Sequence, residues 1–276
     1  MKPLIDSDIL RYEIGYSGQF KDPDTGEEII SDFDRVAELL DAKIDLICEE
    51  VEATEEPTLY LTADKFIAKQ LSRTGEFELK PNFRETIATL KPYKGTRKSD
   101  KPFHFYNLTA YMMSKYKCFI ANGIEADDAM SIDQTENTII CSRDKDLRQV
   151  PGWHYSWECG KQPSIGPVFV EPLGSLQERE DGKVLGYGDK FFYYQMLVGD
   201  AVDNIGGVPR VGPKKALPLL SEAKTARECY LIVKEQYKLH YGDEWLAPLQ
   251  ENANLLWMVR EVNKDGSPLL FRPPKS

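Results

Sequence analysis

The chain has 276 residues, of which 41% are hydrophobic and 29% charged, so it can bury the core of one large domain or two modest ones. Its five cysteines are odd in number and form no CxxC pair, which argues against a disulfide framework or a zinc site and fits a reducing cytoplasm. With no basic and apolar leader, and no apolar run of roughly 18 residues, we expect neither export nor membrane insertion. The net charge of −10 does not exclude nucleic acid, because a local basic patch can bind phosphate and bound metal can neutralise carboxylates.

Apolar periodicity predicts strands that alternate with helices in the first half of the chain. We expect a strand within the opening segment KPLIDSD, further strands at 58–62, 117–121 and 137–142, and helices at 31–51, 105–117 and 124–132. Ser31 is the expected cap of the first of these helices. The alternation predicts an α/β fold with a sheet that is parallel at its centre.

The second half of the chain is less regular at first. Residues 151–188 are rich in proline, glycine and aromatics, which predicts loop or edge structure apart from one candidate strand at 168–171. Helical character returns after residue 189, with a Gly/Pro-rich turn at 206–213 and helices at 223–239 and 243–261. We therefore place a domain boundary between 1–188 and 189–276.

Acidic residues gather where the predicted strands end. Asp6, Asp64, Asp144 and Asp146 each follow an apolar run, and the carboxyl ends of parallel strands share one ligand-binding edge. Glu125, Asp127 and Asp128 lie at a helix start, where the helix dipole alone can explain them. Each acid could be a solvated strand-end residue, but clustered carboxylates are unfavourable without cations. The whole set therefore predicts hard divalent ions, Mg²⁺ or Mn²⁺, and two ions about 4 Å apart can promote phosphodiester hydrolysis.

Four segments resemble a known family. They are LIDSD at 4–8, GIEADDAM at 123–130, SRDKDLRQV at 142–150 and VGDAVDNIGGVPRVGPKKA at 198–216, and LTADKF at 61–66 matches more weakly. Their sequence and order resemble the 5′-nucleases related to flap endonucleases, especially the stand-alone phage exonucleases and the 5′-nuclease domains of bacterial DNA polymerases I.

The resemblance implies a PIN-like nuclease core over 1–188 and a helix–hairpin–helix subdomain over 189–276. It implies that a first metal lies near Asp6, Asp64, Glu125, Asp127, Asp128 and Asp144, and a second near Asp146, Asp200 and Asp203. Two positions depart from the family pattern. Glu13 stands where an arginine is common, for which Arg11 is a candidate substitute, and Asp8 stands where a small polar residue is common.

The basic segment at 91–101 carries five basic residues and one acid. Such a run is usually a solvated face, but the resemblance implies an arch or clamp near 80–104 that contacts the scissile phosphate. Lys94, Arg97 and Lys98 are the candidates for this contact, Lys94 also as a catalytic residue, and Tyr93 is available for base stacking.

The Gly/Pro-rich turn can bring backbone amides close to a phosphate. The resemblance implies that it grips duplex DNA without reading sequence, with K⁺ as an expected ion. The residues concerned are Gly206, Gly207, Gly212, Lys214 and Lys215.

The hypothesis is therefore a monomeric 5′–3′ exonuclease with flap endonuclease and RNA-primer removal activity in DNA replication or repair. Its expected partner is duplex DNA with a 5′ end, flap or RNA primer, in the cytoplasm, or the host cytoplasm for a phage protein. Two alternatives stay open. LIDSDIL also looks like the first motif of a haloacid dehalogenase-type phosphatase, although Leu10 stands where that fold needs Thr or Val. The second alternative is a catalytically silent protein that binds DNA ends.

Overall fold

A computed structural model describes residues 1–95 and 100–275. The chain divides into two compact units. The first comprises Met1–Pro81, Ser99–Arg143 and Trp153–Val168, and the second comprises Asn82–Lys98, Asp144–Gly152 and Phe169–Ser276. The two units are therefore not separated by a single boundary at residue 188, because residues 82–95, 144–152 and 169–188 pack with the C-terminal part of the chain.

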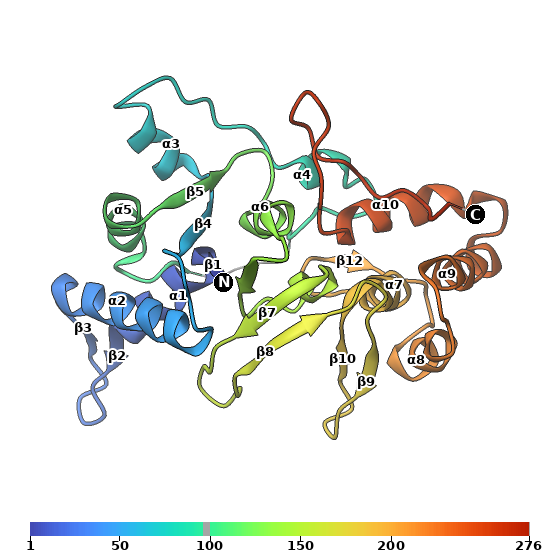
Figure 1. The fold of residues 1–276 in the computed structure, drawn as a ribbon, viewed down its shortest axis with the longest axis horizontal. Coiled ribbons are helices and arrows are strands. Elements are labelled where there is room, and N and C mark those ends of the chain that lie inside the picture. The colour runs from blue at the N-terminus through green and yellow to red at the C-terminus, as the bar shows by residue number, and fades with distance from the viewer. Residues whose placement is uncertain (96–99, 276) are drawn as a thin grey trace. The chain divides into compact units, whose positions relative to one another are not determined.

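The first unit is built on a six-stranded sheet with the order β5-β4-β1-β6-β7-β8 (Figure 1). The strands are β1 (Lys2–Asp6), β4 (Thr58–Thr62), β5 (Cys118–Ala121), β6 (Thr138–Cys141), β7 (Gly152–Ser156) and β8 (Ile165–Val170). The pairs from β5 to β7 are all parallel, with Asp6 in register with Tyr60 and Ile5 with Cys141. The predicted α/β class and mostly parallel sheet are confirmed.

The loop predicted at the start of 151–188 is wrong. Strand β7 pairs in parallel with β6, and three of its five residues are buried. Because a buried strand lacks the alternation of apolar and polar residues, its Gly152 and its aromatic residues looked irregular in sequence. The candidate strand at 168–171 is confirmed as part of β8.

Helices flank this sheet in the first unit. They are α1 (Ser7–Ser17), α2 (Phe33–Glu50), α3 (Lys65–Leu71), α5 (Phe105–Lys115) and α6 (Ala126–Asp133), and a small hairpin joins β2 (Gln19–Lys21) to β3 (Glu28–Ile30). The core packs apolar residues of α1, α2 and α5 against the sheet, including Leu10, Leu40 and Leu59. The helix predicted at 31–51 is confirmed, but its N-cap is Asp32, not Ser31.

The second unit is mainly helical. It contains α4 (Phe83–Ile87), the short 3₁₀ helix η1 (Asp146–Gln149), α7 (Gly188–Val198), α8 (Pro213–Ser221), α9 (Ala226–Tyr241), η2 (Gly242–Glu244) and α10 (Leu246–Leu256). Two hairpins complete it, β9 (Leu176–Glu178) with β10 (Val184–Gly186), and β11 (Gly199–Asp200) with β12 (Ile205–Gly206). Eight of the eleven residues of α7 are buried, so this helix forms the centre of the unit.

A hydrogen-bonded chain ties the central helix to its neighbours. The buried hydroxyl of Tyr237 on α9 donates to the Met196 carbonyl at 2.9 Å and accepts from Asn252 of α10 at 2.8 Å. The helices predicted at 223–239 and 243–261 are confirmed as α9 and α10, although α10 ends at Leu256. No helix in the described part of the chain is long and apolar enough to cross a bilayer.

Candidate active site

Asp6 is fixed at the carboxyl end of β1, in the first unit. It is the N-cap of α1: Oδ1 accepts a hydrogen bond from the Ile9 amide at 3.2 Å, and Oδ2 accepts one from Ser142 Oγ at 2.7 Å. The residue is 1% exposed. The predicted strand-end aspartate is therefore a buried carboxylate, and each of its oxygens accepts a hydrogen bond.

Thr62, at the end of β4, links three elements beside Asp6. Its amide donates to both carboxylate oxygens of Asp8 at 3.2 Å, and its hydroxyl accepts from the Ala126 amide at 2.8 Å. Helix α6 starts at Ala126, so Thr62 fixes the acidic helix start against the sheet. Sequence reasoning missed this residue, although its place beside a strand end was a usable signal.

The acids of the GIEADDAM segment surround the start of α6. Glu125 is the N-cap and forms a capping box with Asp128, whose Oδ2 accepts from the Glu125 amide at 3.2 Å. Asp128 is fully buried, whereas Asp127 in the same turn is partly exposed. The capping box and the helix dipole both stabilise carboxylates here. This agrees with the interpretation that the position at a helix start is enough to explain these acids.

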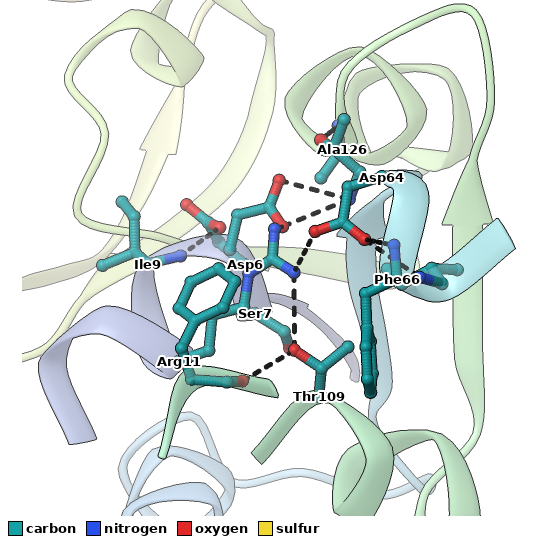
Figure 2. A network of polar contacts seen from close by, with 12 residues as sticks. Asp6, Ser7, Ile9, Arg11, Asp64, Phe66, Thr109 and Ala126 are labelled. Atoms are coloured by element: carbon teal, nitrogen blue, oxygen red, sulfur yellow. Dashed lines mark hydrogen bonds and ion pairs between the residues drawn. The ribbon is translucent and has the colours of Figure 1, made fainter. Parts of the chain in front are cut away.

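Asp64 and Arg11 form a charged cluster in the first unit (Figure 2). Asp64 caps α3 by accepting from the amides of Phe66 and Ile67 at 2.9 Å. The Arg11 guanidinium lies 3.7 Å from Asp64 and 2.8 Å from Asp8, and Lys101 lies 3.8 Å from Asp64. Arginine and lysine side chains thus compensate these carboxylates, and sequence spacing alone did not show that arrangement.

In the second unit, Lys145 is the basic residue that pairs with acidic side chains, as Arg11 does in the first. Its ammonium contacts Asp146 Oδ1 at 2.9 Å and also forms a hydrogen bond with Asp200. Gln195 donates to Asp146 at 2.5 Å, and the Asp146 amide donates to Asp144 Oδ1 at 2.8 Å. The structure therefore brings Asp200 into one polar network with Asp144 and Asp146, which lie more than 50 residues earlier in the sequence.

Charge and burial have opposite effects on two of these acids. Burial, and then the charge of Asp144, raises the pKa of Asp146 to about 7, against the effect of Lys145. Burial also acts against ionisation of Asp200, but the hydrogen bond and charge of Lys145 outweigh it and hold the pKa of Asp200 below its usual value. The ammonium of Lys145 thus partly compensates the negative charge of Asp146 and Asp200.

The predicted DNA-contacting residues also lie in the second unit, where the structure describes them. Helix α7, the β11–β12 hairpin and α8 follow one another, and the Gly/Pro-rich turn lies between β12 and α8. Gly212 is the N-cap of α8 and is exposed, as are Lys214 and Lys215 in the first turn. Arg97 and Lys98 lie outside the described residues.

The predicted glycines have different structural roles. A Cβ on Gly207 would lie 2.3 Å from the Leu197 carbonyl oxygen, so this glycine permits a close approach of two backbone segments. A Cβ on Gly206 would meet nothing nearer than 3.9 Å, and one on Gly212 would meet nothing within 4 Å. Only Gly207 is required by packing.

Within the described residues, no three acidic, histidine or cysteine side chains converge closely enough to hold an ion. The oxygen donors nevertheless have the chemistry that hard divalent cations prefer. The assignment of individual metal ligands stays a prediction.

The sequence and the fold were compared with those of known proteins. No family model matches the chain. It is 30% identical over 203 residues to a 5′–3′ exonuclease of Buchnera aphidicola, an alignment that covers 67% of this chain and 66% of the relative. It is 36% identical over 114 residues to the DNA polymerase I of Rhizobium leguminosarum, covering 38% of this chain and 10% of the polymerase.

Solved structures show the same fold at low sequence identity. The 5′-exonuclease of T5 with bound zinc matches with a TM-score of 0.56 and 15% identity, covering 94% of this chain and 87% of that one. The bacteriophage T5 flap endonuclease, in a complex with DNA and metal ions, matches with a TM-score of 0.54 and 14% identity, covering 93% and 89%.

The sheet order and the flanking helices define a PIN-like α/β fold, as the resemblance implied. The chain belongs to the 5′-nuclease family that includes the 5′–3′ exonucleases.

Proposed function

We propose that this protein is a divalent-metal-dependent 5′-nuclease that hydrolyses phosphodiesters near a 5′ end of DNA and releases 5′-phosphate products. The observation that carries the proposal is a pair of buried carboxylates at the carboxyl edge of the sheet. Asp6 ends β1, and Asp128 lies in the first turn of α6, which packs against β1 and β4. Buried carboxylates are strongly unfavourable without positive charge, and oxygen donors suit Mg²⁺ or Mn²⁺.

The proposed ligands are acidic residues of each unit. In the first unit they are Asp6, Asp64, Glu125, Asp127 and Asp128, and in the second they are Asp144, Asp146, Asp200 and Asp203. When bound, two divalent ions would activate water and stabilise the leaving oxygen of a phosphodiester. The number of ions, and their distribution among these acids, are part of the proposal.

Other residues would bind and orient the substrate. Lys94 is proposed to contact the scissile phosphate as a cation that compensates its charge. The start of α8 is exposed and carries Lys214 and Lys215 in its first turn, which suits a duplex phosphate without base recognition. A K⁺ ion bound at the Gly/Pro-rich turn is also proposed.

The proposed substrates are duplex DNA with a free 5′ end, a 5′ flap or an RNA primer. The names of the relatives support the 5′ polarity, and the bacteriophage T5 flap endonuclease in complex with DNA supports flap cleavage. Action as a cytoplasmic monomer in replication or repair also stays a prediction.

The test uses the full chain with 5′-labelled and 3′-labelled duplex and flap DNA, in Mg²⁺ or in EDTA. We expect cleavage from the 5′ end that EDTA abolishes, and a loss of at least about 100-fold in Asp127→Ala/Asp128→Ala. Asp133→Asn is the matched control, because it alters an acid at the other end of α6 that binds Tyr60. Cleavage that resists EDTA, or that starts only from 3′ ends, would refute the proposal.

Two additional assays separate the two alternatives. A haloacid dehalogenase-type phosphatase would hydrolyse small phosphate esters and leave duplex DNA intact. A silent end-binding protein would retain labelled DNA in a binding assay without cleaving it in Mg²⁺.

A further inference from the structure

Residues 92–94 are hydrogen-bonded to the loop between β11 and β12. Tyr93 Oη donates to Asp203 Oδ2 at 3.1 Å, and the Lys94 amide donates to the Asp203 carbonyl at 3.0 Å. Asn204 Nδ2 donates to the Pro92 carbonyl at 3.0 Å. All of these residues belong to the second unit, so three hydrogen bonds connect two segments that are far apart in the sequence.

The backbone at both ends of this connection is held in an uncommon conformation. Lys94 has a φ of 52° and Asn204 a φ of 60°, in the left-handed region that few residues other than glycine and asparagine adopt. For a lysine this conformation is unfavourable, and it persists only where surrounding contacts determine it. The bond from the Lys94 amide to Asp203 is such a contact, so the loop determines where Lys94 lies.

The Lys94 side chain is also held, through the ring of Tyr93. Its ammonium lies 5.0 Å from the centroid of that ring, within the range of a cation–π interaction. The ring itself is partly buried against the hydrophobic core of the second unit, and its hydroxyl is bound to Asp203. A fixed ring therefore supports the lysine ammonium, and this contact offers a different role from the base stacking predicted for Tyr93.

We propose that Tyr93 is a positioning residue: bound to Asp203 through its hydroxyl, it holds the Lys94 ammonium in place for the substrate phosphate. The proposal rests on the proposed function, in which Lys94 contacts that phosphate. A free lysine side chain loses much rotational freedom when it binds, and a ring that restricts it beforehand lowers that cost. Asn204 supports the same arrangement by binding the backbone one residue before Tyr93.

The test is a double-mutant cycle on a 5′-labelled flap substrate in Mg²⁺. Tyr93→Phe keeps the ring and removes the hydroxyl. We expect kcat to fall about 3–10-fold with little change in KM, the size expected for one hydrogen bond. In the Lys94→Ala background the same change should have no further effect, because the group that Tyr93 positions is absent.

Two further variants control the cycle. Asn204→Gly retains the left-handed backbone but removes the bond to Pro92, and we expect it to lower kcat only when Lys94 is present. Tyr111→Phe also removes a tyrosine–aspartate hydrogen bond, 2.8 Å to Asp41 in the first unit, and should leave kcat unchanged.

The outcomes separate this inference from the proposed function. A parent protein without 5′-nuclease activity overturns both. An active parent in which Tyr93→Phe has no effect, or an equal effect with and without Lys94, overturns the positioning role alone. Equal effects would instead indicate that Tyr93 acts without Lys94, through DNA or through Asp203, and an unchanged rate in Lys94→Ala would also refute the inference.

Discussion

Arg11 is a buried counter-charge in the acidic region of the first unit, and the effect of removing it can be predicted quantitatively. Its side chain is 7% exposed and contacts Asp8 at 2.8 Å and Asp64 at 3.7 Å. Its guanidinium carbon lies 4.3 Å from the centroid of the Phe105 ring, and within the described residues its buried Nε has no hydrogen-bond partner. Arg11→Met keeps most of the side-chain volume and leaves two partly buried carboxylates without this charge.

The size of the effect follows from burial. Removing one partner of a buried ion pair costs about 3–5 kcal/mol, because the other charge is left uncompensated. Asp8 and Asp64 are each 27% exposed, so water recovers part of this loss, and we expect Arg11→Met to lower the free energy of unfolding by about 2–4 kcal/mol. Lys101 also contacts Asp64 but is 39% exposed, so Lys101→Met should cost no more than about 1 kcal/mol.

The measurement is urea denaturation at pH 7 without divalent ions, followed by hydrogen exchange of the β1 and β4 amides. Exchange at these strands reports the first unit separately, since two units can unfold in separate steps. The double variant Asp8→Asn/Arg11→Met should recover part of the lost stability, because it removes one of the uncompensated charges. Equal losses for the Arg11 and Lys101 variants, or no loss for Arg11→Met, would refute the reasoning.

Three further predictions concern charge and close packing. Lys145→Met leaves two carboxylates without their shared ammonium, so we expect a loss of about 1–3 kcal/mol without metal and a larger thermal stabilisation by Mn²⁺ than in the parent; equal shifts would contradict it. Burial opposes ionisation of Asp41, but three donors outweigh it and lower its pKa. Asp41→Asn should therefore cost about 1–3 kcal/mol at pH 7 and progressively less as the pH falls below about 4, and a pH-independent loss in urea titrations would contradict it. Gly207→Ala places a methyl group 2.3 Å from a carbonyl oxygen and should cost at least about 2 kcal/mol, whereas Gly206→Ala, with open space, should cost less than about 1 kcal/mol by the same denaturation measurement.

The sequence by itself determined the fold class and the approximate location of the acids. Apolar periodicity predicted the helix at 31–51 and the strand at 58–62, because both patterns depend on neighbouring residues. The position of Asp6 past an apolar run, together with the rule that parallel strands share one carboxyl edge, predicted a strand-end carboxylate. The order of the acidic segments then indicated the family.

Tertiary structure alone decided which charges compensate these acids. Arg11 reaches Asp64 and Lys145 reaches Asp200 across long stretches of chain, so no local pattern marks the pairs. Strand β7 was missed for a related reason: its residues are fixed by pairing with β6, while their own sequence has no clear period. The apolar periodicity of a segment reflects which of its faces is buried and which is exposed to solvent. Charge pairing depends instead on which distant segments the completed fold brings together.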